Sequence, residues 1–189
     1  MNDINPYTSG EYAKKNPLYH IEDTFFKWNN FFKILEISKI DLNKINSIVD
    51  VGCGSGGILT EAKKSNFFSE NCKYSGHDIN PDAIKLAKEK DKKINFFNED
   101  YINTKNSQAD LIIAADVFGH IENPYDFLKR LRKKGNFFLF NIPLEINLLS
   151  MIRRKNIFKN SYNQVGHLHF YTKKTAVLLL ESCGYKVVK

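Results

Sequence analysis

The fold of this chain is decided by the stretch Ile48-Val49-Asp50-Val51-Gly52-Cys53-Gly54-Ser55-Gly56-Gly57. Its first half is typical of a buried strand, and its glycine-rich second half is typical of a loop that opens a helix. Glycine lacks Cβ and tolerates positive φ, so the backbone of such a loop can approach a ligand closely. The helix that follows directs free N–H groups and a partial positive charge at the same point. The stretch therefore predicts a nucleotide-like cofactor at the end of the first strand.

The glycine spacing alone leaves the kind of nucleotide open. Gly52, Gly54 and Gly57 fit G-x-G-x-x-G, the dinucleotide pattern, and Gly52, Gly54 and Gly56 fit G-x-G-x-G equally well. Asp50 separates the two, because a carboxylate beside the loop would repel the pyrophosphate of a dinucleotide. The same carboxylate would attract the ammonium and sulfonium groups of S-adenosylmethionine. The acid therefore favours S-adenosylmethionine over a nicotinamide cofactor.

A second acid follows the next predicted strand, residues 73–78. Asp78 ends this strand, 22 residues after Gly56. An acid at that spacing is placed to accept hydrogen bonds from ribose hydroxyls, which both kinds of cofactor carry. Asn80-Pro81-Asp82 then predicts a helix start, with Asn80 as the N-cap and Pro81 at the first helical position.

A third acid follows a short predicted strand over residues 94–97. In this architecture Asp100 would lie where an adenine amino group could donate to it, with Tyr101 alongside. The alternative, that Asp100 is an ordinary turn acid, stays open.

These motifs resemble the class I S-adenosylmethionine-dependent methyltransferases. Residues 49–56 resemble that family's first motif, residues 109–124 resemble its fourth strand and the helix entry after it, and the match covers residues 46–189. The resemblance implies a doubly wound α/β fold with S-adenosyl-L-methionine as cofactor. It implies that the cofactor is bound by Asp50, Gly52, Cys53, Gly54, Gly56, Asp78, Ile79, Asp100, Tyr101, Asp116 and Val117.

Two flanking segments, residues 16–23 and 165–172, resemble a narrower bacterial subgroup. Members of that subgroup often accompany polysaccharide or glycolipid biosynthesis. The chain departs from the family pattern at Gly119, where the family often carries an acid, so no contact from such a side chain is expected here.

Methyl transfer from a sulfonium needs mainly alignment and exclusion of water, but a hydroxyl acceptor must also lose a proton. The candidate bases are His120, just beyond the fourth strand, and His167, in the long segment after the fifth. The candidate substrate contacts are His20, Arg153, Arg154 and His169. Each histidine could equally be structural, and the Arg153-Arg154-Lys155 cluster could be a solvated surface loop.

The order of predicted elements gives an α/β architecture with a mainly parallel, doubly wound, Rossmann-like sheet and helices on both faces. A helical leader or lid over residues 1–45 precedes the cofactor domain of residues 46–189, with its first helix capped by Asp23 or Thr24. Later elements are predicted as strands over 109–115, 136–142 and 185–188 and helices over 124–133 and 173–183. A seventh strand is missing from this pattern, so an exposed sheet edge could support a homodimer.

Composition limits the other classes of function. The 189 residues are 42% hydrophobic and 26% charged, as in ordinary globular proteins, and show no apolar run long enough for a membrane span or a signal peptide. The net charge is +7, but the lysines are scattered, so no nucleic-acid partner is expected. Three widely spaced cysteines predict neither disulfides nor a metal site, which fits a cytoplasmic protein.

The sequence therefore predicts methyl transfer from S-adenosyl-L-methionine to a small-molecule acceptor, a sugar hydroxyl or a glycan precursor. The alternatives are an RNA or protein methyltransferase, a protein that binds the cofactor without transferring its methyl group, and a nicotinamide oxidoreductase, which Asp50 disfavours.

Overall fold

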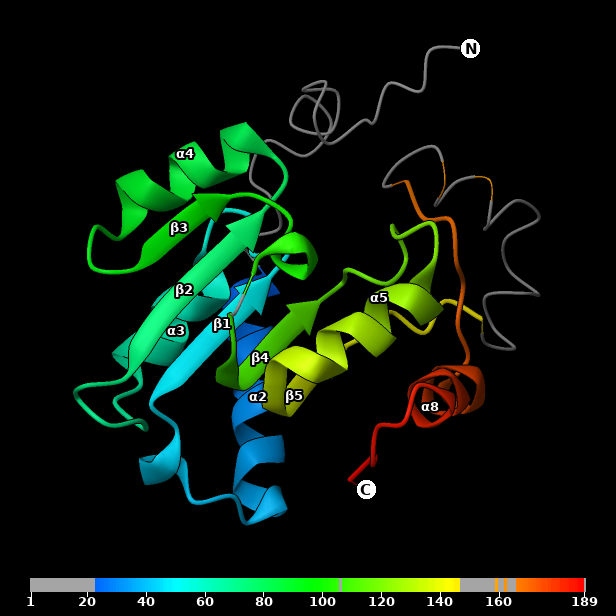
Figure 1. Ribbon diagram of the computed structural model, residues 1–189, viewed down its shortest axis with the longest axis horizontal. Coiled ribbons are helices and arrows are strands. Elements are labelled where there is room, and N and C mark those ends of the chain that lie inside the picture. The colour runs from blue at the N-terminus through cyan, green and yellow to red at the C-terminus, as the bar shows by residue number, and fades with distance from the viewer. Residues whose placement is uncertain (1–22, 106, 147–158, 160–161, 163–165, 189) are drawn as a thin grey trace.

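A computed structural model describes residues 23–105, 107–146, 159, 162 and 166–188. Five strands form one parallel sheet in the order β3-β2-β1-β4-β5 (Figure 1). They are β1 (Ser47–Val51), β2 (Lys73–Asp78), β3 (Asn95–Asn98), β4 (Ala109–Ala115) and β5 (Gly135–Asn141). The order reverses at β1, which is the central strand, so the predicted doubly wound α/β sheet is confirmed. In such a sheet ligands bind at the carboxyl ends of the strands next to this reversal.

Three helices cover one face of the sheet: α2 (Thr24–Ser38), α3 (Gly57–Lys64) and α4 (Pro81–Lys90). Alternate residues of the central strands, among them Ile48 and Leu111, join this core. Helix α2 lies behind the sheet beside α3 in Figure 1, and its Trp28, Phe31 and Leu35 are buried there. The helix of the N-terminal leader is therefore part of the main core.

The opposite face is covered by α5 (Pro124–Leu131) and α8 (Lys173–Ser182), together with the short 3₁₀ turn η3 (Tyr101–Asn103). The strand residues between those of the first face, such as Val49 and Ile112, pack here. Two further 3₁₀ turns, η2 (Leu42–Lys44) and η4 (Arg132–Lys134), lead into β1 and β5.

The helix starts follow the sequence signals. Asn80 caps α4 by accepting hydrogen bonds from the N–H groups of Asp82 and Ala83, and Asn123 caps α5 in the same way from Asp126. Each cap is followed by a proline in the first turn of the helix. Helix α2 begins at Thr24 with Asp23 at the N-cap position, but the Asp23 side chain makes no capping hydrogen bond.

The predicted strand over residues 185–188 is wrong, because this segment is irregular in the structure. Tyr185 instead turns its ring onto Phe138 and Phe140 of β5, with centroids 4.9 and 5.3 Å away, and its hydroxyl donates to the Leu128 carbonyl. Burial of this aromatic side chain holds the segment against α5 and β5 without strand pairing. The helix predicted over 124–133 also ends earlier, as a 3₁₀ turn takes over at Arg132.

None of the described helices combines the length and the apolar character that crossing a lipid bilayer requires.

Candidate functional site

The loop between β1 and α3 takes a backbone conformation that favours glycine. Gly52, Gly54 and Gly56 have φ values of 72°, 52° and 75°. The Gly52 N–H donates to the His77 carbonyl of β2 at 2.8 Å. A Cβ at Gly52 would lie 2.7 Å from Cγ2 of Val117, so the loop packs directly against the residues that follow β4. These contacts place the loop at the carboxyl edge of the sheet, where Gly52 is exposed and Gly54 is half-buried.

The fourth glycine of the motif, Gly57, has a packing role. Gly57 is the first residue of α3, and a Cβ there would meet Oγ1 of Thr24 at 2.5 Å. Its missing side chain makes room for helix α2. The loop glycines are therefore Gly52, Gly54 and Gly56, which is the G-x-G-x-G pattern.

Asp50 is a buried carboxylate beneath this loop. The residue is 1% exposed, and its Oδ1 has no hydrogen-bond partner within the described part of the chain. Burial, followed by the nearby charge of Asp78, raises the pKa of Asp50 well above its usual range, while Lys27 acts in the opposite direction. An unpaired buried carboxylate is costly in a folded protein. The position is therefore suited to a cationic ligand group.

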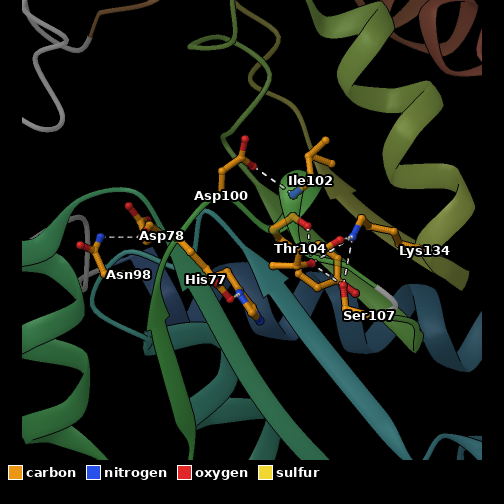
Figure 2. Close-up of polar contacts among 10 residues, drawn as sticks. His77, Asp78, Asn98, Asp100, Ile102, Thr104, Ser107 and Lys134 are labelled. Carbon is orange, nitrogen blue, oxygen red and sulfur yellow. Dashed lines mark hydrogen bonds and ion pairs between the residues drawn. The ribbon is translucent and has the colours of Figure 1, made fainter.

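Asp78 lies at the end of β2, where its backbone carbonyl accepts from Nδ2 of Asn98 at 2.9 Å (Figure 2). Both of its carboxylate oxygens are also engaged. Its Oδ2 accepts from the Gly54 N–H and its Oδ1 from the Asn80 N–H, each at 2.8 Å. Burial raises the pKa of Asp78 in spite of these hydrogen bonds. Asp78 thus holds the glycine loop in place, and the remaining lone pairs of its oxygens are available for ribose hydroxyls.

Asp100 caps the 3₁₀ turn η3 at the adjacent end of β3. Its Oδ1 accepts from the Ile102 N–H at 3.0 Å (Figure 2). Its Oδ2 accepts from Nδ2 of Asn103 at 2.7 Å. These contacts are those of an ordinary acid that caps a turn. Asp100 is also exposed, so its carboxylate is accessible to a ligand. Tyr101 is 1% exposed, and its ring packs in the core against His77, so the ring is not presented at the edge of the sheet.

Lys27 is a site residue that sequence reasoning missed. Its Nζ lies 2.6 Å from Oδ2 of Asp116, the residue after β4. Asp116 has a positive φ of 59° and its other oxygen accepts from the Asn141 side chain, so two neighbours hold this carboxylate in place. The signal for Lys27 was its position on the buried stripe of α2, four residues before Phe31.

The structure brings His120 and His167 together, with ring centroids 4.6 Å apart. Nδ1 of His167 lies 2.8 Å from Oε2 of Glu145, a residue the sequence analysis did not single out. Burial and the neighbouring His167 lower the pKa of His120 to about 4. A Cβ at Gly119 would lie 2.8 Å from Cδ2 of His167, so the glycine that replaces the expected acid makes room for this imidazole.

The remaining predicted site residues are placed separately. Nε2 of His169 lies 3.3 Å from the Glu122 carbonyl, so His169 contacts a different residue from those that His120 and His167 contact. Ile79 is an exposed apolar side chain beside Asp78. Cys53 is buried, and burial together with Asp50 raises the pKa of its thiol, which keeps it protonated. The candidate substrate contacts His20, Arg153 and Arg154 lie outside the described residues.

Comparisons with known proteins agree with this geometry. The model of a methyltransferase domain family matches residues 29–189. A ubiquinone biosynthesis O-methyltransferase of Rickettsia bellii is 31% identical over 109 residues, which cover 54% of this chain and 45% of that protein. The chain therefore spans less than half the length of this curated relative.

Solved structures of low identity share the fold. An Archaeoglobus fulgidus SAM-dependent methyltransferase matches with a TM-score of 0.62 at 21% identity, over 91% of this chain and 76% of that one. The plantazolicin methyltransferase BpumL in complex with SAH matches with a TM-score of 0.60 at 22% identity, over 93% and 68% of the two chains.

Proposed function

The chain belongs to the methyltransferase domain family, and we propose that it transfers a methyl group from S-adenosyl-L-methionine to a hydroxyl oxygen of a small molecule. One observation carries the choice of donor: Oδ1 of Asp50 is buried without a hydrogen-bond partner in the described structure, beneath a loop whose three glycines have positive φ. A pyrophosphate would be repelled there. A cationic amino acid moiety would supply the missing counter-charge.

The charges around the loop suit both ends of that amino acid moiety. Asp50 and Asp116 are placed to attract its ammonium group, and the Nζ of Lys27 is placed to attract its carboxylate. Without the ligand, Lys27 pairs with Asp116 and partly neutralises the two acids. This salt bridge would exchange partners when the cofactor binds.

The nucleoside end would extend along the carboxyl edge toward β2 and β3. Asp78 offers acceptor lone pairs for the ribose hydroxyls, and the exposed side chain of Ile79 offers an apolar surface for the adenine ring. Asp100 lies after the next strand, and its exposed carboxylate would accept from the adenine amino group. Cys53 serves as a small loop residue in this proposal.

When bound, the cofactor supplies a methyl group on a sulfonium, so the acceptor oxygen forms the new C–O bond as the C–S bond breaks and leaves its electron pair on sulfur. A hydroxyl acceptor is supported by the O-methyltransferase named above as a relative. A sugar hydroxyl or glycan precursor is the acceptor that the two flanking segments predict, and a phenolic hydroxyl is the kind that a ubiquinone precursor would present.

Calorimetric titration tests the donor. S-adenosylmethionine and S-adenosylhomocysteine should bind, and NAD⁺ should not. The Asp50→Asn variant should bind S-adenosylhomocysteine roughly 10- to 100-fold more weakly, the cost of losing about 1.5–3 kcal/mol of charge-assisted interaction. Its affinity for 5′-methylthioadenosine, which has no ammonium or carboxylate group, should stay unchanged.

The exposed Asp82→Asn variant is the matched control and should bind every nucleotide like the unmodified chain. Binding of NAD⁺ alone, or equal weakening for both nucleosides in Asp50→Asn, would contradict the proposal. The acceptor class is tested with methyl-tritiated donor and two probes, 3,4-dihydroxybenzoate for phenols and UDP-glucose for sugars. Label in the second probe would support the glycan acceptor.

A further inference from the structure

The histidine pair beside the loop after β4 contains a buried imidazole with an acidic partner. His167 is 8% exposed, and its Nδ1 lies 2.8 Å from Oε2 of Glu145. We propose that His167 is the base that takes the proton from the acceptor hydroxyl and that Glu145 is the positioning residue that holds its imidazole in the required tautomer. This inference rests on the methyl transfer proposed above.

The orientation of the ring assigns its two nitrogens. A carboxylate can only accept at this distance, so Nδ1 carries the hydrogen and donates to Glu145. A neutral imidazole protonated at Nδ1 carries its lone pair on Nε2. Within the described residues, the His167 ring makes no other hydrogen bond. Its Nε2 is therefore unengaged in this part of the chain.

The edge of the ring that carries Nε2 lies against Gly119. The atoms of His167 that would meet a Cβ at Gly119 are Cδ2 at 2.8 Å, Cγ at 3.2 Å and Nε2 at 3.2 Å. Gly119 lies two residues after Val117, whose side chain packs on Gly52 of the glycine loop. The Leu168 N–H also donates to the Gly119 carbonyl at 2.6 Å, which fixes the backbone next to His167. The base and the cofactor loop are therefore held against the same short segment.

His120 is the less suitable base of the two. Its Nδ1 lies 3.4 Å from the Gly166 carbonyl, and its pKa of about 4 makes it a weak proton acceptor at neutral pH. Among the described residues, the charged groups around the pair are Glu145, which contacts His167, and Asp116, and both raise the pKa of His120. A neutral His120 beside His167 adds no positive charge that would oppose protonation of the base.

The proton balance of the step is complete within the site. The hydroxyl proton moves to Nε2 of His167 as the oxygen forms its bond to the methyl carbon. The imidazolium that results keeps its Nδ1–H on Glu145, whose negative charge stabilises it. The proton then leaves to solvent after the methylated product.

Nitrogen NMR on the cofactor-free protein tests the positioning role without any turnover. Long-range ¹H–¹⁵N spectra of [¹⁵N]histidine-labelled protein, recorded at a pH where the imidazole is neutral, should show the hydrogen of His167 on Nδ1. Glu145→Gln should shift this signal toward a mixture of tautomers, because an amide can donate as well as accept. Glu145→Asp should retain the original tautomer. A hydrogen on Nε2 in the unmodified chain, or an unchanged signal in Glu145→Gln, would overturn the proposal.

Methyl transfer to two phenols of different acidity tests the base. His167→Gln should lower kcat by roughly 10²–10⁴-fold with 3,4-dihydroxybenzoate, the range that general-base catalysis contributes. It should lower kcat far less with 4-nitrocatechol, which is already largely ionised at neutral pH. An equal loss with both phenols would overturn the proposal, and so would a His120→Gln loss that equals the His167→Gln loss.

Binding of S-adenosylhomocysteine separates this inference from the proposed function. Normal binding by His167→Gln and Glu145→Gln shows that the cofactor site is intact. If the unmodified chain fails to bind S-adenosylhomocysteine, the proposed function falls, while the tautomer spectra still decide whether Glu145 positions His167.

Discussion

At the scale of single residues, the site is defined by groups that would be unfavourable in an ordinary core. Asp50 is a carboxylate buried without a hydrogen bond to Oδ1 in the described structure, and Asp116 adopts a positive φ that non-glycine residues rarely take. Gly119 leaves space that His167 fills. Unfavourable features of this kind are expected at functional sites, where binding of a ligand or substrate offsets their free-energy cost.

Asp50 should make the stability of the cofactor-free protein pH-dependent. Its pKa is higher in the folded protein than in the unfolded chain, so its contribution to the free energy of unfolding falls as the pH rises above about 4. Asp50→Asn removes this penalty and should have a higher Tm than the unmodified chain at pH 7. The difference should shrink as the pH falls toward 4, where the carboxyl is protonated in both states.

Thermal unfolding followed by circular dichroism at several pH values measures this difference. Asp82→Asn, which changes an exposed acid, should show no such trend. Equal Tm values for Asp50→Asn and the unmodified chain at pH 7 would show that Asp50 is not an uncompensated charge.

Gly119→Ala should separate cofactor binding from methyl transfer. The added Cβ would lie 2.8 Å from Cδ2 of His167 and must displace the ring. The variant should lose a large part of the roughly 10²–10⁴-fold that a general base contributes, while S-adenosylhomocysteine affinity stays the same. Adding Gly119→Ala to His167→Gln should cost little more, and fully additive losses would argue against this mechanism.

At the scale of elements, the first helix after the glycine loop is shaped by two neighbours at once. Helix α3 begins under the loop, and its first residue, Gly57, also lies against Thr24 at the start of α2. Helix α2 carries Lys27 into the site from the same turn. The contact between these two helices therefore sets the position of Lys27 relative to the loop.

Gly57→Ala should destabilise the protein by about 1–3 kcal/mol through overpacking against Thr24. The paired variant Gly57→Ala with Thr24→Ala removes the Oγ1 and Cγ2 contacts at 2.5 and 2.9 Å and should recover part of that loss. Urea denaturation of the two single variants and the double variant gives the coupling energy. A double variant no more stable than Gly57→Ala would show that overpacking against Thr24 is not the cause of the loss.

At the scale of the whole molecule, both faces of the sheet and the leader helix form one packed structure. The side chains of α2 join the same core as Ile48 of β1 and Leu111 of β4. The opposite face is closed by α5 and α8 (Figure 1). Unfolding of α2 alone would expose the main core, so this helix should not melt separately.

Trp28→Ala tests that expectation. Trp28 is 3% exposed, and replacing a buried tryptophan by alanine costs about 3–5 kcal/mol. The loss should appear as a lower midpoint of one urea transition followed by circular dichroism. A separate early transition with an unchanged main midpoint would mean that the leader folds independently of the sheet.

The sequence by itself determined the features that depend on short segments of chain. The apolar run before Gly52, the loop glycines, and the caps at Asn80 and Asn123 each specify local backbone geometry, and their order yields the parallel doubly wound sheet. Tertiary structure alone decided three other features: the Lys27–Asp116 salt bridge, the Glu145–His167 contact and the irregular path after Gly184. These depend on pairs of residues that are distant in the chain, and the energy of such a pair is set by burial and packing that no local pattern encodes.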